Sequence, residues 1–173
     1  MKKIVALLML VCIALLPAAV AESVTWEEVG GAAVEAYGLE GDFVTFDEMG
    51  LAIWIPSDLS SVEPSEEDVA NGRYALYIDN DQECYLAVDA INVEGMTLDQ
   101  ALENAVNNGM TEPEMVTING LDAVTYADPN NNIGVIVLVD TNSNMIIFSF
   151  GPVDSDEGKI AYGVIASSLM PAA

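Results

Sequence analysis

Two apolar runs near the C-terminus constrain the fold more than any other feature of this sequence. Residues 133–139 read "IGVIVLV" and residues 145–150 read "MIIFSF", with apolar side chains at both even and odd positions. Because side chains alternate between the two faces of a strand, such runs are typical of strands covered on both faces. The link "DTNSN" between them is far shorter than the crossover that parallel neighbours need. The two runs therefore predict adjacent antiparallel strands in a sheet with helices on each face.

Other segments extend this pattern. Five more have the composition and bounding turns of strands: residues 43–46, 51–55, 73–78, 84–93 and 121–127. Helices are predicted in "EPSEEDVANG" with a cap at Ser65, in "TLDQALENAVNNG" with a Thr97–Gln100 capping box, and in "DSDEGKIAYGVIASSLM" with caps at Asp154 and Glu157. The predicted fold class is α+β, a three-layer α/β/α sandwich around a mainly antiparallel sheet of about seven strands.

The first 21 residues have the three parts of a secretory signal peptide. Lys2 and Lys3 supply the positive start, "IVALLMLVCIALL" the apolar centre, and "AVA" the small residues before the cleavage point. The apolar run is shorter than the roughly 18–20 residues that span a bilayer, which favours cleavage over a membrane anchor. We therefore expect a secreted, extracellular protein, cleaved after Ala21 and free of the membrane afterwards.

After residues 1–21 we expect a short N-terminal segment and one domain. Residues 22–40 read as an N-terminal arm or a marginal helix, because Gly30 and Gly31 interrupt a segment that begins with a Thr25–Glu28 capping box. Residues 41–173 read as a single globular domain, long enough to bury a core without a disulfide. The sequence leaves open whether the arm docks on the domain, and what the oligomeric state is.

The charge of the chain excludes some partners. All 28 acidic residues follow residue 21, where the basic residues are Arg73 and Lys159, so the mature net charge is −26. Such a surface repels nucleic acid and anionic lipid, both of which bind proteins through neutralised phosphates. We expect no nucleic-acid partner, good solubility in an extracellular medium, and a loose attraction for divalent cations.

Few residues here can carry out chemistry. The chain has no histidine, and Cys84 is its single cysteine after residue 21, which excludes Ser-His-Asp and Cys-His groups and nitrogen- or thiolate-rich zinc sites. Cys84 shares strand parity with Leu86 and Val88, and we expect a buried, inert thiol. A carboxylate pair could serve a hydrolase, but among 28 carboxylates such pairs arise by chance. We therefore expect no enzyme, no catalytic residues and no cofactor, with a carboxylate-dependent hydrolase as a minor alternative.

Two loops resemble the start of a calcium site. Their oxygen-bearing side chains alternate along "DNDQE" and "DPNNN": Asp79, Asp81 and Glu83 in the first, and Asp128, Asn130 and Asn132 in the second. A calcium loop of the EF-hand type needs glycine at position 6 and glutamate at position 12, and counting from Asp128 these positions are Ile133 and Val139. We favour a hairpin turn on a sheet edge for "DPNNN", with weak Ca²⁺ binding at these six residues as the alternative.

Both tryptophans have a structural and a functional interpretation. Exposed tryptophans can hold carbohydrate or peptide. Trp54, in "LAIWIP", is predicted to be core beneath a covering helix. Trp26 begins the doubtful N-terminal segment, where it is either exposed or holds that segment against the domain.

The order of these elements resembles a known family. "GDFVTFDEMGLAIWIP", "SEEDVANGRYALYI", "TLDQALENAVNNG", "INGLDAVTY" and "MIIFSFGPV" follow one another as in small secreted proteins of gut-type Firmicutes bacteria with a PsbP-like α/β/α fold. The resemblance spans most of residues 41–170, and Asn119-Gly120 matches the family's turn before a strand. It implies a secreted, non-enzymatic binding or assembly module whose partner is an extracellular protein or polymer, with no family active site to transfer.

Overall fold

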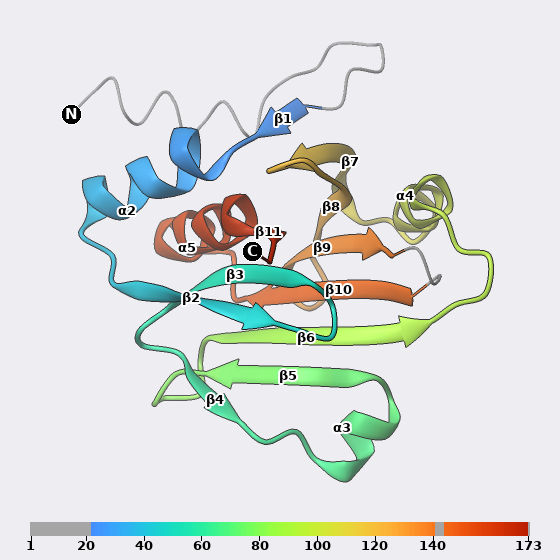
Figure 1. Ribbon diagram of the computed structural model, residues 1–173, viewed down its shortest axis with the longest axis horizontal. Helices are drawn as coiled ribbons and strands as arrows, with labels where there is room; N and C mark the ends of the chain where they lie inside the picture. Colours follow the sequence, from blue (N-terminus) through green and yellow to red (C-terminus); the bar gives the residue numbers. More distant parts are fainter. Residues whose placement is uncertain (1–21, 141–143, 173) are drawn as a thin grey trace.

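The computed structural model describes residues 22–140 and 144–172, so the predicted signal peptide lies outside the described residues. Within them the chain forms two sheets and five helical segments (Figure 1). The strands are β1 (Glu22–Val24), β2 (Gly41–Phe46), β3 (Leu51–Pro56), β4 (Ser60–Val62), β5 (Arg73–Ile78), β6 (Tyr85–Asn92), β7 (Thr111–Ile118), β8 (Leu121–Asp128), β9 (Ile133–Val139), β10 (Asn144–Gly151) and β11 (Met170–Pro171). The helical segments are η2 (Trp26–Gly30), a π-helical turn, and the α-helices α2 (Gly31–Tyr37), α3 (Glu66–Ala70), α4 (Leu98–Asn107) and α5 (Asp156–Ser168).

The large sheet has eight strands in the order β1-β7-β8-β9-β10-β6-β5-β4. All neighbours are antiparallel except β1, which pairs parallel to β7. The two apolar runs are β9 and β10, paired with Phe148 opposite Ile136, so their predicted adjacency is confirmed. The expectation of about seven mainly antiparallel strands in one sheet is corrected to a mixed sheet of eight strands.

The predicted hairpin of residues 43–46 and 51–55 forms as β2 and β3, but it belongs to a second sheet, β11-β3-β2. This small sheet packs on the large one: the ring of Phe46 in β2 lies 6.2 Å from that of Phe148 in β10. Local pattern identifies a strand but does not specify the sheet that it joins, which explains the miscount.

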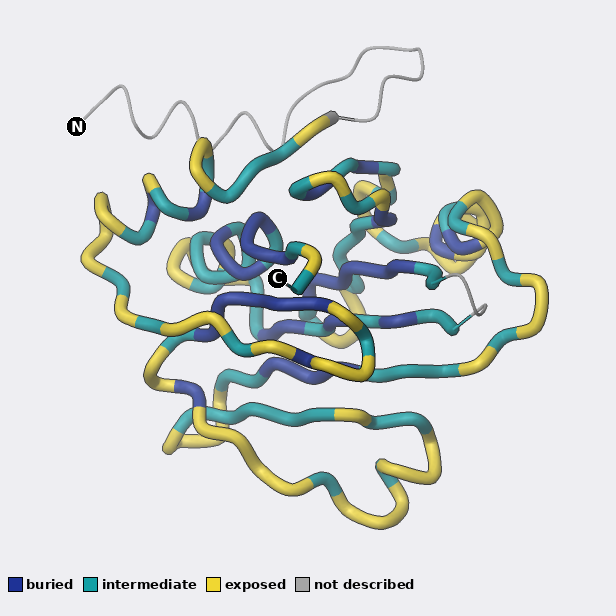
Figure 2. Tube along the Cα trace, in the orientation of Figure 1, coloured by how far each residue is buried: buried dark blue, intermediate teal, exposed yellow. Residues whose placement is uncertain are grey.

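The two faces of the large sheet are covered unequally. On one face, α5 and the small sheet bury the main core, which includes Ile53, Leu86, Phe148 and Ile165. On the other face, α4 packs on β7, β8 and β9 through a smaller cluster around Ala101 and Val124. Figure 2 shows β3 and β9 mostly buried, whereas β5 is half-buried or exposed along its length.

The N-terminal segment docks on the domain, which answers the point that the sequence left open. Asn119, in the turn between β7 and β8, makes the connection. Its Oδ1 accepts the Trp26 backbone N–H at 2.8 Å, and its Nδ2 donates to the carbonyls of Ser167 and Leu169 at 2.8 and 2.9 Å. Asn119 has φ +46° and Gly120 φ +85°, as a tight turn with two left-handed residues requires. The predicted turn at Asn119-Gly120 is confirmed.

Three local predictions need correction. The Thr25 hydroxyl donates to the Glu28 carboxylate, but its side chain accepts no backbone N–H, so the predicted capping box does not form. Helix α5 is capped by Ser155, whose Oγ accepts the N–H of Gly158, in place of Asp154. Strand β7 was missed because Pro113 lies within it, beside an irregularity in its pairing with β8.

The other predicted caps are present. Ser65 caps α3 by accepting the N–H of Asp68, and Thr97 and Gln100 form the capping box of α4. Across residues 22–140 and 144–172, none of the helices is long and apolar enough to cross a membrane.

Candidate binding surfaces

The strand register places a row of side chains on the face of the large sheet that α4 only partly covers. Cross-strand partners point to the same face of a sheet, so one row runs from β8 to β4. In order it contains Tyr126, Val135, Ser149, Ala87, Leu76 and Val62. A parallel row contains Val124, Val137, Ile147, Asp89 and Arg73. A third pairs Tyr85 with Ile78 and Ile78 with Ser60.

Exposure is greatest at the end of these rows away from α4, although Ala87 within the first row is only 1% exposed. Val124 and Val135 belong to the α4 cluster and are buried, whereas Leu76 and Ile78 are half-buried and Val62 is 36% exposed. We call the part of this face beyond α4 the open face: Val62, Leu76, Ile78, Tyr85 and Ser149, with Ile147 at its border with the α4 cluster. It is largely apolar, and exposed apolar surfaces on folded proteins can mark interaction sites.

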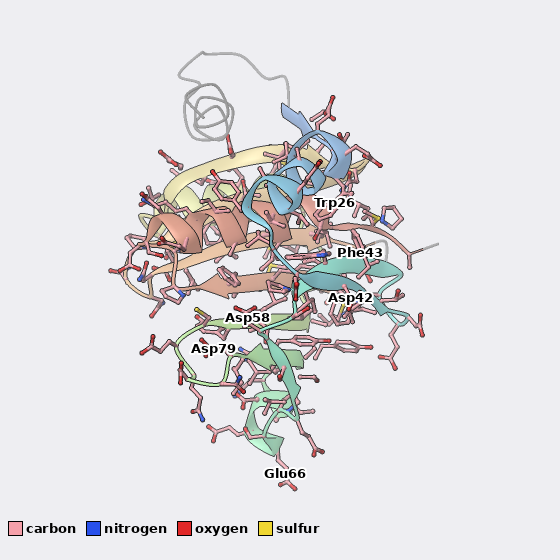
Figure 3. All side chains as sticks on the ribbon, turned by 90° about the vertical axis from the view of Figure 1, so that its left-hand side faces the viewer. Trp26, Asp42, Phe43, Asp58, Glu66 and Asp79 are labelled. Atoms are coloured by element: carbon pink, nitrogen blue, oxygen red, sulfur yellow. The ribbon has the colours of Figure 1, made fainter. Side chains whose placement is uncertain are left out.

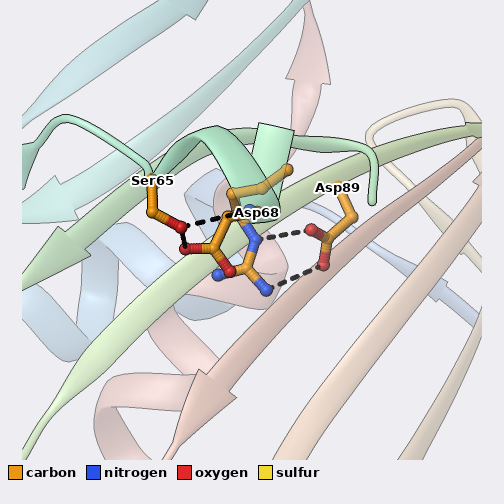
Figure 4. A network of polar contacts seen from close by, with 4 residues as sticks. Ser65, Asp68 and Asp89 are labelled. Atoms are coloured by element: carbon orange, nitrogen blue, oxygen red, sulfur yellow. Dashed lines mark hydrogen bonds and ion pairs between the residues drawn. The ribbon is translucent and has the colours of Figure 1, made fainter. Parts of the chain in front are cut away.

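One ion pair lies within the open face. The Arg73 guanidinium in β5 donates through Nε and Nη2 to both carboxylate oxygens of Asp89 in β6 (Figure 4). The two side chains are 25% and 18% exposed, so the pair is partly shielded from water. Arg73 is one of two basic residues after residue 21, and pairing neutralises it. The open face therefore carries little net charge on a strongly acidic protein.

Two tyrosines lie on this side of the large sheet, Tyr85 within the open face and Tyr126 nearer to α4. Burial raises the pKa of Tyr85, with the nearby Arg73 partly offsetting that effect. Burial also raises the pKa of Tyr126, and the negative charge of Asp128 adds to it. Both phenols are therefore neutral at physiological pH, where each presents a hydrogen-bonding hydroxyl next to an apolar ring.

On the other side of the large sheet, a pocket of about 310 Å³ opens between α5 and the end of the small sheet. Its walls come from the loop after α2, the end of β3 and the turn that follows, and include Leu39, Glu40, Trp54, Pro56 and Asp58. Phe43, which is 43% exposed, and Trp26 lie close by, with their ring centroids 5.2 Å apart (Figure 3). A shallower hollow of about 400 Å³ beside α4 is lined mainly by exposed polar side chains such as Gln100 and Glu103.

The "DPNNN" stretch is a hairpin turn between β8 and β9. Asp128 Oδ1 accepts the N–H of Asn130 at 2.9 Å, its Oδ2 accepts from Nδ2 of Asn131 at 2.7 Å, and Asn132 has φ +58°. These bonds lower the pKa of Asp128, led by that from the Asn131 side chain. The turn is confirmed, but it joins two interior strands and not strands at a sheet edge.

The "DNDQE" loop uses its first carboxylate in the same way. Asp79 Oδ1 accepts the Glu83 N–H at 2.8 Å, while Asp81 and Glu83 are exposed. In the described part of the chain, no group of three histidine, cysteine, aspartate or glutamate side chains converges as metal ligands would. Calcium binding at the six loop residues stays a prediction.

The remaining singled-out residues lie as follows. Cys84 was expected to lie within a strand and to be buried, but it precedes β6 and is half-buried. Burial, followed by the charge of Asp79, raises the pKa of its thiol, which agrees with the expected inert thiol. Trp54 is core, as predicted, with an exposed fraction of 4%. Trp26 is half-buried, with its ring 6.2 Å from that of Trp54, and holds the N-terminal segment against the domain.

Sequence reasoning did not single out the open face. The segments "RYALYI" and "CYLAVDAINV" have apolar residues at both even and odd positions, so the sequence does indicate that both faces of these strands are apolar. Which of the two parities is left uncovered depends on where α4 packs.

The comparisons with known proteins bear on the fold. No protein-family model matches this chain, and no curated protein matches it. Among solved structures, this PsbP-like mixed α/β fold has a counterpart in the cyanobacterial PsbP protein. That solution structure, of CyanoP from Synechocystis sp. PCC 6803, has a TM-score of 0.53 and 12% sequence identity, over 77% of this chain and 93% of that one. At this identity the likeness shows the fold alone, and it confirms the PsbP-like fold implied by the order of the elements.

Proposed function

We propose that this protein is a secreted, non-enzymatic binding or assembly module that docks an extracellular protein through the open face. The observation that carries the proposal is the half-exposed apolar surface of β4, β5, β6 and β10 beyond α4. Secretion is supported by the signal-peptide pattern of residues 1–21, and an origin in gut-type Firmicutes by the family resemblance. The absence of histidine from the sequence and the raised pKa of the Cys84 thiol favour a binding role over catalysis.

The charge distribution specifies the chemistry of the partner. The open face is apolar around one neutralised ion pair, whereas the whole chain has a formal net charge of −24. A complementary partner has an apolar patch framed by lysine and arginine side chains. A second copy of this chain is a poorer occupant, because two strongly acidic surfaces repel each other.

The test compares capture of partners from the native extracellular fraction by three forms of the protein. Leu76→Asp places a charge in the middle of the open face, and we expect it to abolish capture of a partner that the wild type retains. Val106→Asp is the matched control, because Val106 lies on α4 and is already 57% exposed. Capture should weaken as the salt concentration rises, because salt screens the attraction between the lysine and arginine side chains of the partner and the acidic surface of this protein.

The proposal is wrong if Leu76→Asp and wild-type protein, both shown to be folded by circular dichroism, capture the same proteins. Analytical ultracentrifugation of the purified protein tests the alternative that a second copy of the chain occupies the open face. A stable dimer that Leu76→Asp dissociates would assign the open face to a second copy of the chain.

A further inference from the structure

The pocket at Trp54 has a feature that the proposed protein docking does not use. Trp54 is 4% exposed, yet its indole N–H has no hydrogen-bond acceptor among the described residues. No fully buried side-chain nitrogen or oxygen in those residues lacks a partner. The Trp54 Nε1 therefore keeps some contact with solvent, and Trp54 is one of the residues that line the pocket. A hydrogen-bond donor without a protein partner, on a side chain that is more than nine-tenths buried and lines a cavity, is suited to binding a ligand.

The position of the indole is set by its surroundings. A Cβ on Gly41 would overlap the indole ring, so glycine at this position lets the ring lie against the backbone of β2. The Trp54 backbone N–H donates to Ser168 Oγ at 2.9 Å, which ties β3 to the end of α5. The Ser57 N–H donates to the Glu40 carbonyl at 2.9 Å and joins the two loops that form the walls. These contacts join the strand, the helix end and the two loops around the pocket.

The other walls define which ligand fits. Glu40 and Asp58 supply exposed carboxylates, which accept hydrogen bonds, and Leu39 and Pro56 supply apolar contact. No basic residue lines the pocket, and the acidic chain repels anions. An ammonium group would satisfy the carboxylates but has no lone pair to accept from the indole N–H. A hydroxyl group both donates and accepts, so it satisfies both kinds of wall.

We propose that this pocket binds a neutral saccharide, whose hydroxyls donate to Glu40 and Asp58 and accept from the Trp54 indole N–H. Its volume of about 310 Å³ lies at the lower end of the roughly 300–1,000 Å³ of ligand pockets, which suits one small unit of a longer chain. The site lies on the opposite side of the large sheet from the open face, and it is independent of the docking proposed there.

The experiment observes the Trp54 indole directly. The chain has two tryptophans, so the proton–nitrogen correlation spectrum of isotope-labelled protein has two indole signals, which Trp54→Phe assigns. If that variant does not fold, Trp26→Phe assigns them by elimination. The probes are glucose, galactose, mannose, xylose and N-acetylglucosamine with their short neutral oligosaccharides, and glycine and ethylamine as charged competitors. We expect one class of sugar to move the Trp54 signal saturably, and by more than the Trp26 signal.

Substitutions in the walls complete the test. Glu40→Gln and Asp58→Asn each remove a charged acceptor, and each should weaken binding about tenfold. Glu66→Gln is the control, because this exposed carboxylate lies on α3, far from the pocket (Figure 3), and binding should be unchanged. The inference is overturned if no sugar produces a saturable shift of the Trp54 signal. It is also overturned if the wall substitutions leave the affinity unchanged, or if glycine or ethylamine binds more tightly than every sugar.

Discussion

The Asn119 side chain joins three parts of the chain, and its removal should destabilise the whole fold. Asn119→Ala removes one accepted and two donated hydrogen bonds, which link the turn to the start of η2 and to the end of α5. Each such bond contributes about 1 kcal/mol net. Asn119 also has φ +46°, a conformation that costs alanine about 1 kcal/mol more than asparagine. The expected loss is about 4 kcal/mol, a large part of the roughly 5–15 kcal/mol of a typical domain.

Urea unfolding followed by circular dichroism measures this loss as a fall in the transition midpoint. Gly120→Ala is the control, because Gly120 also has positive φ but a Cβ there would meet nothing within 4 Å. It should cost only about 1 kcal/mol, from the backbone conformation alone. If Asn119→Ala cost no more than Gly120→Ala, the connection through Asn119 would not stabilise the N-terminal segment, and our account of its docking would be wrong.

Three further predictions concern packing, pH and salt. Gly134→Ala would place a Cβ 2.6 Å from the Tyr162 ring, whose hydroxyl donates to the Val135 carbonyl; we expect about 2 kcal/mol of destabilisation, and an unchanged melting temperature would refute this close packing. Burial raises the pKa of Tyr126 above its unfolded value of about 10. The neutral phenol therefore stabilises the fold fully below about pH 10, and this stabilisation is lost as pH rises through the folded pKa. Tyr126→Phe should therefore lose less stability than the wild type in alkaline urea titrations, and equal losses would contradict the shift. Moderate NaCl should raise the melting temperature by screening the repulsion of 28 carboxylates, whereas a fall would argue for stabilising charge pairs.

The sequence predicted elements whose signals are local. The Thr97–Gln100 capping box and the apolar period behind it specify α4, and Asn119-Gly120 specifies its turn, because each depends on residues within a few positions. The "DPNNN" turn could also be predicted, because the Asp128 side chain accepts hydrogen bonds from the residues that directly follow it. Arrangements between distant segments were not. That β2 and β3 leave the large sheet depends on packing of Phe46 against Phe148, which are about a hundred residues apart.

The candidate surfaces were hidden for the same reason. The alternation in "RYALYI" identifies two faces of β5, but its exposure depends on α4 reaching no further than β9 and its neighbours. Trp54 was correctly predicted as core, yet the pocket that it lines depends on how the loop after α2, the end of β3 and α5 come together. Such features depend on contacts that no short stretch of sequence contains.

Site-specific photocrosslinking tests the docking role most directly. A photoreactive benzoylphenylalanine replaces Ile78 on the open face or, as control, Val106 on the exposed side of α4, and the protein is irradiated in the native extracellular fraction. We expect one defined crosslinked product from position 78, containing a partner with a basic-rimmed apolar patch, and none from position 106. Equal products from both positions, or none from position 78, would contradict the account.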